Sequence, residues 1–205
     1  MLRIFAMLSI FVTIAGLGAI YVLSRGEEDR FAQCRNGAVA GGSAAIGGPF
    51  ELIDENGVAV TDREVFDEPS ILYFGYTFCP DVCPMDVSRN AEAVYLLEER
   101  GISVKPVFIS IDPSRDTPEA LRDFTDAMHP RMLGLTGTPA QVKSASQAYR
   151  TYYRKQDGGD PDYYLVDHST YSYLVLPEQG FVDFFNRNET PAGMAERIGC
   201  FLDNS

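Results

Sequence analysis

An apolar run that ends in two cysteines constrains this chain more than any other feature. Residues 70–78 (SILYFGYTF) predict a buried strand, and residues 79–84 (CPDVCP) follow it directly. From residue 84 to residue 100 apolar side chains recur every three to four positions, which predicts a helix, and Gly101 is typical of a helix end. The sequence therefore places Cys79 and Cys83 in a turn between a strand and a helix.

Strands and helices alternate along the rest of the chain. Expected strands cover residues 50–53, 58–60, 104–111, 131–135, 163–166, 171–176 and 181–185, and expected helices cover residues 117–128, 138–150 and 190–200. Alternation predicts a parallel sheet, to which the late strand pair adds antiparallel strands. The expected fold class is α/β: a thioredoxin-like fold with an N-terminal strand hairpin and an extra helix insertion, preceded by one transmembrane helix.

The N-terminal region predicts a membrane anchor. Residues 4–23 carry no charged side chain, and a helix of about 20 apolar residues crosses a bilayer. An uncleaved signal anchor fits better than a cleaved signal peptide, because the apolar stretch is long and no small-residue cleavage site follows it. The predicted organisation is a transmembrane signal anchor at residues 1–24, a flexible linker at residues 25–47 and one domain at residues 48–205.

Charge limits both the partners and the orientation. The net charge of −12 argues against nucleic acid as a partner, because phosphate binding needs a basic surface. Arg3 favours an N-terminus in the cytoplasm, although Arg25 and Arg30 on the other flank weaken that bias. We therefore expect a single-pass protein of a bacterial inner membrane with its soluble domain in the periplasm, where thiols are prone to oxidation.

Cys79 and Cys83 are candidates for a metal site, a redox couple or both. Residues four apart lie on one face of a helical turn, so the two sulfurs can meet one ion or each other. A helix N-terminus favours thiolates through its partial positive charge. Two thiolates suit Cu(I) or Zn(II). A structural zinc site needs four ligands, and a set of four is hard to assemble from a chain with two histidines whose other two cysteines lie far away in the sequence. Copper is therefore expected over zinc.

His168 is the predicted third ligand. It lies just before the expected strand at residues 171–176, and in a thioredoxin-like sheet the turn before that strand faces the dithiol. Thioredoxins usually place a proline there, whereas this chain has none between Asp167 and Tyr171. Either Asp167 or Ser169 could orient the imidazole.

Other polar residues have simpler explanations. His129 precedes a proline at a helix end, where a cation is favourable. Asp81 is interpreted as a solvated turn residue rather than one that tunes the thiols. Asp112 and Asp116 fit turn formation and helix capping better than a cation site, and either Asp116 or Thr117 can cap the helix that follows.

Several aromatic and cysteine residues leave more than one interpretation open. Residues 152–155 (YYRK) are either a strand end or a patch that faces a partner. The remaining tyrosines are interpreted as core and sheet-face residues: Tyr163, Tyr164, Tyr171 and Tyr173. Cys34 and Cys200 could pair and pin the linker to the domain, or they could be unrelated.

Four segments together resemble the Sco/SenC family: residues 75–84, 111–118, 134–138 and 166–169. The resemblance covers residues 47–200 and implies a membrane-tethered copper protein that assists assembly of cytochrome c oxidase. It implies Cys79, Cys83 and His168 as ligands of copper, Cu(I) or Cu(II). The implied partner is oxidase subunit II with its dinuclear copper site, and another periplasmic copper chaperone is a further candidate partner. Cys34 and Cys200 lie outside the family pattern.

Two functions remain open at this point. A metallochaperone would hold copper on two thiolates and one imidazole and pass it on by ligand exchange. A dedicated thiol-disulfide oxidoreductase would instead cycle Cys79 and Cys83 to keep the cysteines of the partner site reduced, so that the chain would be an enzyme. A peroxidase is a weaker third interpretation, because only the fold points to it.

Overall fold

The computed structural model describes residues 16, 29–35, 46–157 and 163–205. The predicted signal anchor at residues 1–24, apart from residue 16, and most of the predicted linker lie outside these residues. In the described part of the chain, no helix is long and apolar enough to cross a membrane.

A mixed sheet forms the centre of the domain. Within the described residues seven strands pair in the order β2-β1-β5-β4-β3-β8-β9, and a separate pair joins β6 to β7. The strands are β1 (Glu51–Asp54), β2 (Ala59–Thr61), β3 (Ser70–Gly75), β4 (Lys105–Ser110), β5 (Leu133–Thr136), β6 (Tyr153–Lys155), β7 (Val166–His168), β8 (Ser172–Leu176) and β9 (Gly180–Phe185). β3, β4 and β5 are parallel, whereas β1 and β8 pair antiparallel to them.

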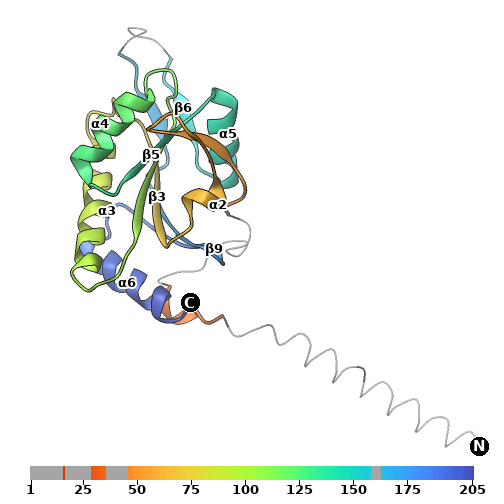
Figure 1. The fold of residues 1–205 in the computed structure, drawn as a ribbon, viewed down its shortest axis with the longest axis vertical. Coiled ribbons are helices and arrows are strands. Elements are labelled where there is room, and N and C mark those ends of the chain that lie inside the picture. Colours follow the sequence, from red (N-terminus) through yellow and green to blue (C-terminus); the bar gives the residue numbers. More distant parts are fainter. Residues whose placement is uncertain (1–15, 17–28, 36–45, 158–162) are drawn as a thin grey trace, which may run out of the picture.

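Helices cover both faces of this sheet. Figure 1 shows α3, α4 and α6 on one side and α2 and α5 on the other. The helices are α2 (Asp62–Val65), α3 (Val82–Glu98), α4 (Pro118–Met128), α5 (Pro139–Ala148) and α6 (Pro191–Asp203), with a short 3-10 helix η1 (Ala32–Cys34). All six residues of β3 are buried, as a central strand covered on both faces requires.

The predicted architecture is largely confirmed. The N-terminal hairpin, the parallel strands and the extra helix α4 are all present. Two details were wrong: residues 62–65 form a helix rather than a connection, and the strand expected at residues 163–166 lies instead at Val166–His168. The segment left open at residues 152–155 forms a strand, because Tyr153 to Lys155 pair with β7.

Burial separates the four tyrosines and the histidine that the sequence interpretation assigned. Tyr164 and Tyr173 are buried as expected, but Tyr163 and Tyr171 are exposed and were wrongly assigned to the core or sheet face. His129 was interpreted as a cation at a helix end, yet its ring is buried and packs at a tilt against the ring of Tyr95. Burial lowers the pKa of His129, so the neutral ring is favoured there.

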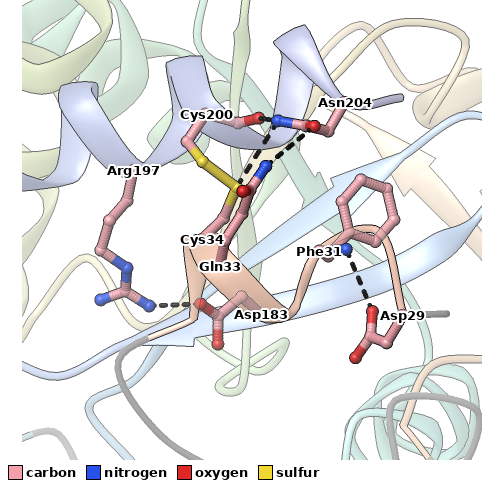
Figure 2. The surroundings of a disulfide bond; sticks show 8 residues. All are labelled: Asp29, Phe31, Gln33, Cys34, Asp183, Arg197, Cys200 and Asn204. Carbon is pink, nitrogen blue, oxygen red and sulfur yellow. Dashed lines mark hydrogen bonds and ion pairs between the residues drawn. A yellow bond between two sulfur atoms is a disulfide. The ribbon is translucent and has the colours of Figure 1, made fainter.

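Cys34 and Cys200 form a disulfide, which resolves the question that the sequence left open. Figure 2 shows the bond between η1 and the last turns of α6. Phe31 and Cys34 are buried in the same apolar cluster as Ile198 and Phe201. Residues 29–35 of the predicted linker therefore lie against the domain.

Candidate metal centre

Three elements bring the predicted ligands together at one end of the sheet. Cys79 follows β3 in a short loop, Cys83 lies in the first turn of α3, and His168 ends β7. The two sulfurs and an imidazole nitrogen all lie within 4.8 Å of one another. Cys83 is fully buried, whereas Cys79 and His168 are partly exposed. The site therefore opens to solvent on the side of Cys79 and His168.

The N-terminus of α3 supports a thiolate at Cys79. The backbone N–H of Cys83, one of the free donors of the first helical turn, donates to Cys79 Sγ over 3.3 Å. The pKa of Cys79 is held well below its usual value, chiefly because the Cys83 thiol donates to it, with further help from the backbone N–H groups of Cys83 and Asp81. The same hydrogen bond, together with burial, raises the pKa of Cys83. One thiolate and one thiol therefore share the site.

The tautomer of His168 suits a ligand. Its Nδ1 lies 2.8 Å from the carbonyl oxygen of Ser169, and a carbonyl can only accept, so Nδ1 carries the proton. Nε2 is then free of a proton in the neutral ring and lies 3.3 Å from Cys83 Sγ. Of the two residues predicted to orient the imidazole, Ser169 orients it through its backbone carbonyl. The carboxylate of Asp167 instead accepts a hydrogen bond from the side-chain amide of Gln156.

Two tyrosine rings pack against the imidazole of His168. Tyr73 and Tyr76 stand edge-on to His168, with ring centroids 6.2 and 5.8 Å away. The hydroxyl of Tyr73 donates to the buried Asp86, whose carboxylate pairs with Arg89 of the same helix. Sequence reasoning missed both tyrosines, because a Tyr inside an apolar strand carries no sign of which face it occupies until the sheet is known.

Arg89 connects α3, the helix that contains Cys83, to β8, the strand that follows His168. Its guanidinium donates to Ser172 Oγ at 3.0 Å, at the start of β8, and to the backbone carbonyl of Asn186. The side chain is buried. A buried charge is tolerated only with such partners, so this contact fixes α3 against β8.

Asp116 braces the loop that carries Cys79, a contact that its interpretation as a cap residue missed, whereas Asp112 lies in the expected turn. Asp116 is buried and accepts hydrogen bonds from the backbone and hydroxyl of Thr77 and from the hydroxyl of Ser110. Burial raises the pKa of Asp116. Asp112 accepts from Tyr164 and pairs with Arg115. The cap of α4 is its neighbour, a threonine at position 117.

Gly75 is required by a close approach beneath the site. A Cβ at this position would lie 3.0 Å from Cys83 Sγ and 2.9 Å from ring carbons of Tyr73 and Phe108. The two ring contacts are shorter than a side chain tolerates, and both rings are fully buried. A side chain at position 75 would therefore force these rings to move and would crowd the buried sulfur of Cys83.

Alkylation is expected to modify Cys79 much faster than Cys83, because Cys79 is a partly exposed thiolate and Cys83 a fully buried thiol. The low pKa of Cys79 predicts a rate that is nearly constant from pH 5.5 to 8, whereas an ordinary thiol with a pKa of about 8.5 gains about tenfold per pH unit there. Iodoacetamide time courses read by peptide mass spectrometry measure both rates. Equal labelling of the two cysteines, or a steep rise with pH at Cys79, would contradict this arrangement.

The donor set fits copper. Two sulfurs and one imidazole nitrogen are the soft and intermediate ligands that copper prefers, and His168 presents an unprotonated nitrogen. Its second nitrogen is held by a backbone carbonyl, as is usual for ligating histidines. Cys79 and Cys83 are both free cysteines rather than a disulfide in this structure.

Comparison with known proteins identifies the family. The family model for SCO1/SenC matches residues 39–203, most of the chain. The chain belongs to the SCO1/SenC family. Among curated relatives of this family, Protein SenC of Rhodobacter capsulatus is 56% identical over 192 residues, which cover 94% of this chain and 86% of that protein.

Solved SCO1/SenC structures share the fold. A crystal structure of Arabidopsis thaliana ScoI with copper bound is 42% identical, with a TM-score of 0.73, and the match covers 78% of this chain and 99% of that one. Yeast Sco1 with copper bound is 37% identical, with a TM-score of 0.74, and the match covers 78% of this chain and 90% of that one. The predicted mixed α/β, thioredoxin-like fold is thus confirmed.

Proposed function

We propose that this protein is a membrane-tethered copper metallochaperone. It binds one copper ion as cargo through Cys79, Cys83 and His168 and assists assembly of the dinuclear copper site of cytochrome c oxidase subunit II. The observation that carries this proposal is the cluster of three ligand atoms within 4.8 Å, in a family whose solved members include copper-bound structures. Residues 4–23 supply the anchor in the bacterial inner membrane, with the domain in the periplasm.

The three ligands differ in ways that suit transfer. Cys83 is buried and fixed by α3, so it keeps its place during exchange. Cys79 lies in a loop and is partly exposed, so a partner thiolate can approach the metal beside it. His168 is a neutral donor that leaves without taking a charge from the site. We therefore expect a partner cysteine to displace His168 or Cys79 before Cys83.

X-ray absorption on the purified full chain in detergent tests the ligand set. After loading with Cu(I) or Cu(II) and desalting, we expect one copper per chain with two sulfurs and one nitrogen in its inner sphere. Elemental analysis gives the stoichiometry. A copper bound only by nitrogen and oxygen, or no stoichiometric copper after desalting, would overturn the proposal.

A dedicated thiol-disulfide oxidoreductase is the second candidate, and the thiolate character of Cys79 favours it. Cys79 would attack one sulfur of a partner disulfide and release the other as a thiolate. Cys83 would then lose its proton and attack the Cys79 sulfur, which releases the second partner thiol and leaves a Cys79–Cys83 disulfide. A His168→Ala protein that still restores oxidase assembly would favour this function, since His168 takes no part in these steps.

A further inference from the structure

The disulfide belongs to a larger contact between the predicted linker and the domain. The ring of Phe31 is buried and lies 5.2 Å from the ring of Phe201. The side-chain amide of Gln33 donates to Asn204 at 3.0 Å, and Arg35 donates to the carbonyl oxygen of Val182 at 3.2 Å. Figure 2 shows this short segment held along the end of α6. An apolar ring, a covalent bond and two hydrogen bonds therefore fix residues 31–35.

This contact lies at the end of the domain away from the candidate metal centre. The apolar cluster around the disulfide includes Ile71, near the start of β3, and Leu97, near the end of α3. The metal centre lies after the end of β3 and at the start of α3. Figure 1 shows η1 and α6 at one end of the domain and β6 at the other. The length of β3 alone separates them by roughly 17 Å, at about 3.3 Å per residue.

The fixed segment changes the length of the tether. From Leu23, the last residue of the apolar stretch, to Asp29 there are six residue steps, which span at most about 20 Å when fully extended. From Leu23 to Gly48 there are 25 steps. A flexible, glycine-rich chain of that length has a root-mean-square reach of about 28 Å and can extend to about 85 Å. The disulfide thus replaces a long tether by a short one.

We propose that the Cys34–Cys200 disulfide orients the domain on the membrane. This inference rests on the proposed function, in which residues 4–23 are the anchor. The anchored chain meets the domain at Asp29, at most about 20 Å of chain from the anchor, so the end of the domain that carries α6 is held next to the bilayer. The Cys79–Cys83–His168 site points away from it. The partner that this arrangement fits is a protein whose copper-accepting cysteines stand well above the bilayer surface.

Energy transfer from the site to the lipid tests the orientation. A maleimide dye on Cys79 is the donor, and headgroup-labelled lipids in vesicles that contain the full chain are the acceptors. An insertion of about 15 glycine and serine residues between positions 40 and 41 lengthens only the tether that the disulfide bypasses. In the wild-type protein we expect the same transfer efficiency with and without the insertion.

A variant without the fixed contact is the matched comparison. In Phe31→Ala/Cys34→Ser/Cys200→Ser the site can tilt toward the lipid, so transfer is expected to rise above the wild-type value. The transfer efficiency of this variant should also change on insertion, because the root-mean-square reach of the chain from Leu23 to Gly48 grows from about 28 to about 35 Å. An insertion that alters transfer equally in both proteins, or in neither, would overturn the inference. Flotation of the vesicles separately reports the anchor: a chain that does not float would refute both the anchor and the orientation.

Proteolysis gives a second measurement that needs no destabilised variant. A protease site placed between residues 36 and 45 allows the chain to be cut between the anchor and Gly48. The cut wild-type domain is expected to float with the vesicles, since Cys34–Cys200 still joins it to the anchor, and a reductant is expected to release it. Release by the cut alone, from vesicles that retain the N-terminal fragment, would overturn the inference while leaving the anchor intact.

Discussion

Loss of any one of the three ligands is expected to abolish tight copper binding. Cys79→Ser and Cys83→Ser replace a soft sulfur by a hard oxygen at nearly the same size, and His168→Ala removes the only nitrogen of the group. Loss of an outer-shell partner typically lowers metal affinity by about 10–100-fold, so loss of an inner ligand should cost more than about 100-fold. Competition with a Cu(I) chelator measures the dissociation constant.

Two variants near the site serve as controls for this series. Ser169→Ala keeps the backbone carbonyl that orients His168, so we expect nearly unchanged affinity, although the hydroxyl that receives the Tyr152 N–H is lost. Asp167→Asn changes a partly exposed carboxylate that points to Gln156 rather than to the imidazole. Tight stoichiometric copper in His168→Ala would refute the three-ligand assignment, because the two sulfurs would then be sufficient.

The sequence was sufficient to find the candidate ligands because each carries a local signal. Cys79 and Cys83 follow an apolar strand and open a helix, so both ends of their turn are visible in the pattern. His168 could be added because strand order in a thioredoxin-like sheet places its turn beside the dithiol. The expected strand there was displaced, yet the histidine still faced the cysteines, since it lies at the end of β7 just before β8.

The supporting residues could not be predicted in the same way. Asp116 and Thr77 are 39 positions apart and meet only because β3 and β4 are neighbours in the sheet. Locally either Asp116 or Thr117 could cap the helix, and Thr117 is the residue that does so. His129 shows the same limit: its place at a helix end is visible in the sequence, but the burial that keeps it neutral depends on tertiary packing.

Removal of the Cys34–Cys200 disulfide is expected to lower the free energy of unfolding by about 3–5 kcal/mol. The bond joins residues 166 positions apart, and in the chain-entropy model a loop of that length restricts the unfolded chain strongly. For a domain of this size that change corresponds to a melting temperature lower by roughly 6–20 °C. Calorimetry of Cys34→Ser/Cys200→Ser measures it, and the reduced wild-type protein should melt at a similar temperature.

The position of the bond separates its effect on stability from any effect on copper. Because the disulfide cluster is built on the start of β3 and the end of α3, we expect copper affinity at moderate temperature to stay within about threefold of wild type. Gln33→Ala, which removes only an exposed hydrogen bond to Asn204, should change the unfolding free energy by no more than about 0.5 kcal/mol. A Cys34→Ser/Cys200→Ser variant that melts within about 2 °C of the wild type would contradict the stabilising role of the disulfide. A variant that loses copper while still folded would contradict the separation of the metal site, at one end of β3, from the disulfide at the other.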